Sequence, residues 1–222
     1  MKYQMYTPTV NLVWSTPNGD ELVAEMARVS VIENKGKPIE KLIHYLMEHN
    51  HPSPFQMVNL CVEVFAPRDI TRQIIRHSSL NFQEMSGRYS EYPDSHFVLR
   101  EPRFQHLKNR QMSVDMNLDC EFDARIHQQF LLDQVVLIDT ARDYYRDALN
   151  RGIAKEQARC LLPEGNTLSR MYINGTLRSW IHYLQVRTDI GSVQREHVQV
   201  ADAIQAIFKQ QFPIIHKAFF EA

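Results

Sequence analysis

One long internal segment of the chain contains neither of the two residues that most often end a helix. No glycine occurs between Gly87 and Gly152, and no proline occurs between Pro102 and Pro163. Because glycine and proline are poorly tolerated inside helices, and because apolar residues recur at helical spacing, we predict one long helix over Cys120–Asn150. Two apolar stripes run along it, one formed by Phe122, Ile126 and Phe130 and the other by Leu131, Val135 and Ile138. A helix that is apolar over so much of its circumference usually packs on more than one neighbour, which can include another subunit.

The rest of the chain mixes strand-like with helix-like segments. Residues 57–65 alternate in polarity, with Val58, Leu60, Val62 and Val64 on one face, as expected for a strand. We also predict strands at 3–14, 96–100 and 170–174, helices at 20–30, 38–49, 68–77, 154–161, 177–186 and 193–211, and turns over the polar segment 78–92. No shift in composition marks a domain boundary. The sequence therefore predicts a single α+β domain over residues 1–222.

Charge and cysteine usage exclude several classes of protein. The chain has 25 Lys and Arg residues against 26 Asp and Glu residues, a net charge of −1, whereas a dedicated nucleic-acid-binding domain is usually strongly basic. Three scattered cysteines, Cys61, Cys120 and Cys160, are too few for a disulfide framework or a thiolate metal site. No apolar run approaches the roughly 18–20 residues of a membrane span, and the first 14 residues lack the pattern of a signal peptide. We therefore expect a cytoplasmic protein with no membrane partner and no nucleic-acid partner.

The densest group of polar residues lies at 72–89. If this stretch begins on a helix, Arg72 and Arg76 lie one turn apart, with Gln73 and His77 at the same spacing beside them. Guanidinium groups bind phosphate oxygens bidentately, and the Ser86–Arg88 segment adds a hydroxyl, a glycine whose backbone a ligand can approach, and a third guanidinium. Such a group suits a ligand that joins a phosphate to a heterocycle. The alternative is a solvated helix face followed by a surface loop.

The same residues match a known sequence pattern. Arg76-His77-Ser78, followed after seven residues by Ser86, resembles the Arg-His-Arg-(seven)-Ser signature of flavin-dependent thymidylate synthases. Further segments resemble the family, and they occur in the same order along the chain as in the family. They are His51–Phe55, Glu84 to Tyr89, Ala158–Pro163, and Asn174–Arg178 through Arg187, with Gln194 and Glu196 beyond. Two more, Arg103–Gln105 and Lys108–Gln111, are similar to its viral and phage-like members.

The resemblance implies both a fold and a reaction. The fold would be an antiparallel sheet flanked by helices, in a homotetramer whose active sites are shared between subunits. The reaction would be the methylation of dUMP at C5 to give dTMP, with methylenetetrahydrofolate as the carbon donor and FAD, reduced by NADPH, as the cofactor. The protein would work in the cytoplasm, or in the host cytoplasm if it is viral.

The resemblance also assigns individual residues to the ligands. Arg187 would be the catalytic residue, because a fixed guanidinium beside N3 and O4 of the uracil stabilises the anion that develops in the ring. The residues that bind dUMP would be Gln73, Arg76, Glu84, Ser86, Gly87, Arg88, Arg159 and Arg187. The residues that bind FAD would be Ser53, Arg76, His77, Ser78, Glu84, Thr176, Arg178 and His182.

Two other functions stay open. Ser78 stands where the signature has arginine, so one alternative is a nucleotide- and flavin-binding relative whose catalysis is impaired. The other is an RNA- or single-stranded-DNA-binding module that uses Arg72, Arg76, Arg88 and the aromatic residues. The balanced charge counts against this last alternative.

Cysteine and histidine chemistry offers two further hypotheses. Cys160 could be a nucleophile, but no histidine flanks it, and we expect a buried core residue, as for Cys61 in its alternating strand. His49 and His51 suggest zinc, but the chain has no His-Glu-x-x-His motif, so we expect no metal.

Overall fold

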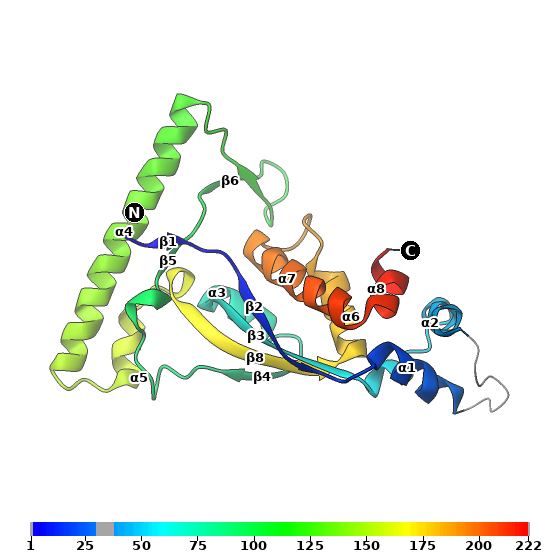
Figure 1. Cartoon of the computed structure of the whole chain (residues 1–222). Helices are drawn as coiled ribbons and strands as arrows, with labels where there is room; N and C mark the ends of the chain where they lie inside the picture. The colour runs from blue at the N-terminus through cyan, green and yellow to red at the C-terminus, as the bar shows by residue number, and fades with distance from the viewer. Residues whose placement is uncertain (1, 30–37, 222) are drawn as a thin grey trace.

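The computed structural model describes residues 2–29 and 38–221. Its centre is a four-stranded antiparallel sheet with the strand order β2-β3-β8-β4 (Figure 1). The strands are β2 (Thr9–Ser15), β3 (Asn59–Pro67), β4 (Asn81–Glu84) and β8 (Leu168–Thr176). The alternation predicted for β3 is confirmed, since Leu60, Val62 and Val64 are all fully buried on one face. Met171 and Ile173 of β8 are buried on the same face, so the two central strands supply the floor of the core.

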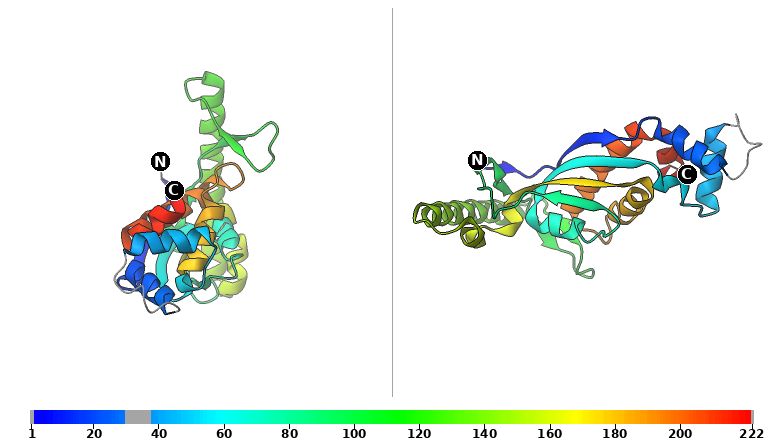
Figure 2. Two further views of the ribbon diagram at one scale, coloured as in Figure 1. Left: turned by 90° about the vertical axis from the view of Figure 1, so that its right-hand side faces the viewer. Right: turned by 90° about the horizontal axis from the view of Figure 1, so that it is seen from below.

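Helices cover one face of this sheet. Contacts with its strands come from α3 (Arg68–Ile74), α6 (Leu177–Arg187) and α7 (Arg195–Gln211), and α8 (Pro213–Phe220) packs on α7. The view from below in Figure 2 shows the strands in front of α7 and α8. The opposite face carries polar side chains, including Arg170, which donates hydrogen bonds to Glu63 and to the Tyr172 hydroxyl. The sheet is therefore packed on one side and polar on the other, as is common for antiparallel sheets.

Strand β8 passes directly into helix α6 without a connecting residue. Thr176 ends the strand and is the N-cap of the helix, where its hydroxyl accepts a hydrogen bond from the backbone N–H of Ser179 at 3.4 Å. Inside the core, Trp180 of α6 donates from Nε1 to the backbone oxygen of Leu60 at 2.9 Å. The helix is thus fixed to the sheet both at its first residue and one turn later.

The long helix predicted from the glycine- and proline-free segment is confirmed. Helix α4 spans Glu121–Asn150 and lies at the end of the sheet opposite α1 (Gly19–Arg28) and α2 (Ile39–Glu48) (Figure 1). Its Leu131 and Ile138 join a second apolar cluster beside β5 (Val98–Leu99) and α5 (Lys155–Ala158). Phe122 and Phe130 of the other stripe face outward together with Leu132, Val136 and Leu137, all at least half exposed, while Ile126 of that stripe is half-buried. The expectation that this helix packs on more than one neighbour fits a face that this chain leaves uncovered.

Smaller elements complete the fold. They are β1 (Gln4–Met5), which pairs with β5, the hairpin of β6 (Arg103–Gln105) and β7 (Ser113–Asp115), and the 3₁₀ turns η2 (Pro54–Gln56), η3 (Asp94–His96), η4 (Arg159–Leu161) and η5 (Glu164–Asn166). Within the described part of the chain, no helix combines the length and the apolar character that crossing a membrane requires.

Some sequence predictions were wrong in detail. The segment 78–92, predicted as turns, contains strand β4. Its polar sequence shows no strand pattern, and it forms a strand because it pairs with β8. Helix α3 ends at Ile74, three residues before the predicted end. The hairpin β6–β7 and helix α8 were not predicted. The end of the helix predicted at 20–30 lies outside the described residues.

Candidate active site

Two predicted site residues meet where helices α3 and α6 end. His77 follows the last turn of α3, and Arg187 is the last residue of α6. The Nε of Arg187 donates a hydrogen bond to Nε2 of His77 at 2.7 Å. Because arginine only donates, this ring nitrogen of His77 must be unprotonated, and the proton of the neutral ring lies on Nδ1. Burial, together with the charge of Arg187 and with His182, lowers the pKa of His77 to about 4, so the ring stays neutral at pH 7.

Gln73 reaches the same region from α3. Its Nε2 donates to the side-chain oxygen of Gln194 at 2.7 Å, and its Oε1 lies 3.3 Å from Nδ1 of His197. The ring of Tyr183 connects the two halves, because it packs edge-on against His77 and its hydroxyl hydrogen-bonds to His197. We call Gln73, His77, Arg187, Gln194 and His197 the helix-end cluster. The resemblance gave a role to Gln73, His77 and Arg187. His197 and its neighbour Tyr183, which lies outside the cluster as defined, were not predicted as site residues.

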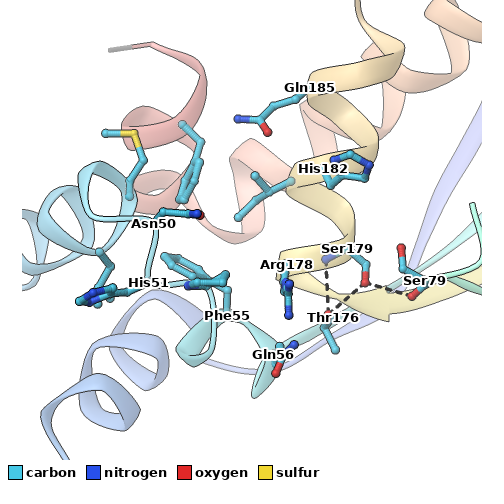
Figure 3. A pocket seen from close by; sticks show the side chains of 15 residues that line it. Asn50, His51, Phe55, Gln56, Ser79, Thr176, Arg178, Ser179, His182 and Gln185 are labelled. Carbon is cyan, nitrogen blue, oxygen red and sulfur yellow. Dashed lines mark hydrogen bonds between the residues drawn. The ribbon is translucent and has the colours of Figure 1, made fainter. Parts of the chain in front are cut away.

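A cavity of about 540 Å³ lies between α2 and α6 (Figure 3). Thr176, Arg178 and His182, three of the residues assigned to FAD, line it together with Ser79 and His51. Figure 3 shows hydrogen bonds between Thr176 and Ser179 and between Ser179 and Ser79, which align these groups along one wall. We call this the α2–α6 cavity. Its volume lies in the range of small-molecule sites, and its donors suit an anionic, ring-containing ligand.

Ser53, also assigned to FAD, lines a different hollow. That hollow lies beside Lys41 and Tyr45 of α2, and it shares His51 and Leu46 with the α2–α6 cavity. The two hollows are therefore neighbours on either side of the His51–Phe55 segment.

Another group of predicted residues gathers beside α5. The guanidinium of Arg88 lies 3.5 Å from the Glu156 carboxylate, and Arg159 donates from Nε to the backbone oxygen of Glu156 at 3.3 Å. The hydroxyl of Ser86 accepts from the backbone N–H of Arg88. We call Ser86, Gly87, Arg88, Glu156 and Arg159 the loop cluster. In Figure 1, α5 lies at the α4 end of the sheet, away from α6, whose last residue is Arg187.

The structure gives Gly87 a packing reason that the sequence did not. A Cβ atom at this position would lie 2.7 Å from the ring of Tyr92, closer than two carbon atoms can approach. The glycine therefore lets Tyr92 pack against the loop that carries Arg88, and any side chain at residue 87 would force the Tyr92 ring to move.

Three other predicted residues have different surroundings. Glu84 accepts a hydrogen bond from Thr71 at 3.0 Å and lies 3.3 Å from Arg72, so its carboxylate already has partners within the chain. Arg76 and Ser78 are exposed, and Arg76 forms no ion pair within residues 2–29 and 38–221. The prediction that Arg72, Gln73, Arg76 and His77 share one side of a helix was wrong, because α3 ends before the last two.

The expectation for Cys160 was also wrong. Its side chain is exposed, because it lies on a single 3₁₀ turn whose flanking residues Ala158 and Leu162 take the positions that face the core. Cys61 is buried in β3 as expected. Among the described residues, no three His, Cys, Asp or Glu side chains are arranged to hold a metal ion. The His49 ring stacks on Tyr45 at 4.0 Å between centroids.

A comparison with protein families shows which family the chain belongs to. The sequence model of the thymidylate synthase complementing protein family matches residues 11–214, which include all three groups. The chain belongs to the thymidylate synthase complementing protein family. The fold predicted from the resemblance, an antiparallel sheet flanked by helices with one long helix, is thereby confirmed.

Relatives within this thymidylate synthase complementing protein family cover almost the whole chain. A flavin-dependent thymidylate synthase from Synechocystis is 39% identical over 91% of this chain and 89% of its own length. A probable flavin-dependent thymidylate synthase from Paramecium bursaria Chlorella virus 1 is 37% identical over 98% of both chains. Among solved structures, the UMP/dUMP methylase PolB from Streptomyces cacaoi, bound with 5-Br dUMP, superposes with a TM-score of 0.85 at 27% identity and covers 99% of this chain and 97% of its own.

Proposed function

We propose that this protein is a flavin-dependent thymidylate synthase that methylates dUMP at C5 to give dTMP. Methylenetetrahydrofolate would donate the carbon, and NADPH would reduce the flavin, FAD. Family membership and the relatives of the same name support the reaction class. The observation that carries the proposal for this chain is the Arg187–His77 hydrogen bond, which holds a guanidinium at the edge of a region that also contains Gln73. A cytoplasmic location remains part of the proposal.

Arg187 would activate the pyrimidine. Its Nε is occupied by His77, and its two terminal NH₂ groups make no hydrogen bond to any residue in 2–29 or 38–221, so they remain for N3 and O4 of the uracil. A permanently charged fork that is already oriented stabilises negative charge as C5 becomes nucleophilic, without reorganising during the reaction. This assignment needs no cysteine nucleophile.

The α2–α6 cavity would hold much of the flavin. Arg178 supplies a cation, Thr176 and Ser79 supply hydroxyls, and His182 supplies a ring nitrogen, a set that fits a phosphate-bearing cofactor with ring carbonyls. Ser53, Arg76, His77 and Ser78 would meet other parts of it. When bound, the flavin supplies the reducing equivalents, and the protein supplies binding and orientation. Because Ser78 stands where the family signature has arginine, this chain would offer the cofactor one cation fewer.

The loop cluster would bind the nucleotide phosphate. Arg88 and Arg159 lie on either side of Glu156, and the backbone at Gly87 and the Ser86 hydroxyl add neutral donors. Arg76 would join them, and Glu84 would orient the ligand through the bonds that it makes with Thr71 and Arg72.

We propose that the site is completed by a second subunit of a homotetramer. The loop cluster lies beside α5 at the α4 end of the sheet, whereas Arg187 ends α6, and the outer face of α4 exposes six large hydrophobic side chains, Tyr144 included. Both observations are explained if one nucleotide meets Arg187 of one chain and Arg88 of another. Residues 1–222 would then act as one domain, since the bridge between Phe97 and Thr167 joins the α4 region to the sheet.

Subunit mixing tests the shared site. Subunits with Arg187→Ala, refolded together with subunits carrying both Arg88→Ala and Arg159→Ala, should regain activity that neither parent has at low dUMP. Random assembly would restore about a quarter of the sites. Mixed oligomers that stay inactive would show that each chain builds its site alone.

Tritium release tests the reaction itself. Protein incubated with dUMP labelled at C5 should release tritium only when FAD, NADPH and methylenetetrahydrofolate are all present. An impaired relative, the alternative raised by Ser78, would bind dUMP and flavin without release. Absence of both binding and release would remove the proposed function.

A further inference from the structure

A series of hydrogen bonds, buried at its Tyr183 end and partly buried beyond it, runs from Tyr183 to Glu196 through the helix-end cluster. In order, it joins Tyr183, His197, Gln73, Gln194 and Glu196, with distances of 3.1, 3.3, 2.7 and 3.0 Å between the bonded atoms. Tyr183 and His197 are fully buried, and Glu196 is 3% exposed. No role has been assigned above to His197 or Glu196, although both adjoin the proposed nucleotide site.

The direction of every bond in this series is fixed from its Glu196 end. Arg103 donates to the Glu196 carboxylate at 2.5 Å, and the guanidinium of Arg100 forms an ion pair with it at 3.0 Å. Burial favours the neutral form of Glu196, but the two arginines outweigh it and hold the pKa below its ordinary value. The carboxylate therefore only accepts, so Gln194 must turn its NH₂ group toward Glu196 and its oxygen toward Gln73.

The same logic then fixes Gln73 and His197. Facing the oxygen of Gln194, Gln73 must donate from Nε2, which turns its own oxygen toward His197. Nδ1 of His197 must therefore carry a proton, and Nε2 accepts from the Tyr183 hydroxyl. Burial, with Arg187 and His77 nearby, lowers the pKa of His197 to about 3, which agrees with a neutral ring carrying one proton.

We propose that His197 is a positioning residue: as the second partner of the Gln73 amide, it keeps that amide in the orientation that Gln194 sets and that binds the nucleotide. These two bonds leave Gln73 with two unused hydrogen-bonding groups. One is the second N–H of its amide nitrogen, on the side of Gln194, and the other is the second lone pair of its amide oxygen, on the side of His197. A flipped amide would exchange the two, and a phosphate or carbonyl oxygen of dUMP, which only accepts, would meet a lone pair instead of a donor. This inference rests on the proposed function, since it assumes that Gln73 contacts dUMP.

Matched substitutions of His197 test the proposal. His197→Leu removes the donor to Gln73 and should raise KM for dUMP roughly 5–10-fold, with kcat within about twofold, as for one lost hydrogen bond. His197→Asn places an amide N–H near the position of Nδ1 and should restore most of the affinity. His197→Gln places its N–H near the position of Nε2, too far from Gln73, and should behave like the leucine variant. His216→Asn changes a buried histidine of α8 that does not contact Gln73 and should leave KM unchanged.

A double substitution separates positioning from general damage. If His197 acts through Gln73, then Gln73→Ala combined with His197→Leu should have the KM of Gln73→Ala alone. Effects that multiply, or Asn and Gln variants with equal KM, would overturn the proposal, and the Asn–Gln contrast decides it even if His197→Leu does not fold. Wild-type protein that fails to turn over dUMP would remove the proposed function and this inference together. Wild-type turnover with an unchanged KM across the histidine series would remove the inference alone.

Discussion

The helix-end cluster and the loop cluster carry residues proposed for the same nucleotide, yet they are built in opposite ways. Around Arg187, the neutral partners are partly or fully buried, and the directions of their hydrogen bonds are fixed by Arg187 and by Glu196. Around Arg88, the side chains of Arg88 and Glu156 are 57% and 50% exposed and 3.5 Å apart, a pair of the kind that adds little stability. The chain thus keeps rigid structure where ring charge would change during reaction. It leaves solvated cations in the loop cluster, where the proposed ligand group, a phosphate, would keep its charge throughout the reaction.

The largest effect should come from removing the rigid guanidinium. Arg187→Ala should lower turnover at least roughly a hundredfold, because an oriented donor to developing charge is lost. FAD should stay bound, since the α2–α6 cavity is unaltered, and flavin absorbance after gel filtration measures this alongside tritium release. Arg187→Lys is the matched control: it keeps the charge but not the fork, and it should stay impaired. Near-normal turnover by Arg187→Ala would end the assignment of Arg187.

Acid should weaken the helix-end cluster before the loop cluster. The pKa values of His77 and His197 are lowered to about 4 and about 3, while unfolded histidine titrates near 6.5, so the unfolded chain takes up protons first. The free energy of unfolding should be full above about pH 7.5 and fall by on the order of 5 kcal/mol as the pH drops toward 4.5, with about half from each histidine.

Urea unfolding at several pH values measures this loss. His197→Asn cannot take up a proton at residue 197, so its stability should depend less steeply on pH between 6.5 and 4.5. A wild-type curve that is flat over this range would mean that the two histidines are not held neutral.

A smaller effect is expected in the loop cluster. Arg88→Ala should raise KM for dUMP roughly tenfold and leave kcat within about threefold, because one charge-assisted contact to the phosphate is lost. The wild-type KM should also rise with salt, since this cation is exposed. Arg125→Ala, an exposed arginine of α4 paired with Glu121, is the control. Equal losses of kcat in Arg88→Ala and Arg187→Ala would erase the distinction between the two clusters.

The smallest effect should come from Cys160, which lies beside Arg159 in the exposed turn. Cys160→Ala should keep turnover within about twofold and stability within about 0.5 kcal/mol, as for other surface substitutions. Kinetics and thermal unfolding check both. Loss of activity in a folded Cys160→Ala protein would support the alternative that the Cys160 thiolate is a nucleophile. The loop cluster would then take part in the chemistry as well as in phosphate binding.

Much of the fold was predictable because local pattern and tertiary structure agree. Helix α4 followed from a segment without glycine or proline, and β3 followed from alternation. Strand β4 could not be found this way, since its sequence, Asn-Phe-Gln-Glu, becomes a strand only beside β8. Helix α8 is apolar around much of its circumference, and its N-terminus is bound by Asp20 of α1, a contact 194 residues away in sequence.

The candidate site was predictable only through the resemblance. The signature identified His77 and the matched C-terminal segment identified Arg187, but their hydrogen bond joins residues 110 positions apart. His197 and Tyr183 carry no motif of their own. The only sequence feature pointing to this part of the site was the pair Gln194 and Glu196. Its role follows from the hydrogen bond between Gln194 and Gln73 of α3, which the sequence does not show.

The direct passage of β8 into α6 couples two geometries that most proteins separate with a loop. One residue added within β8 would turn the side chains on one side of the insertion to the opposite face of the sheet, and one added at the start of α6 would rotate the helix by about 100°. Either change would swing the far end of α6, and Arg187 with it, out of reach of His77. Length variation among functional variants should therefore be confined to the linker at 188–194, which can lengthen without rotating the arginine.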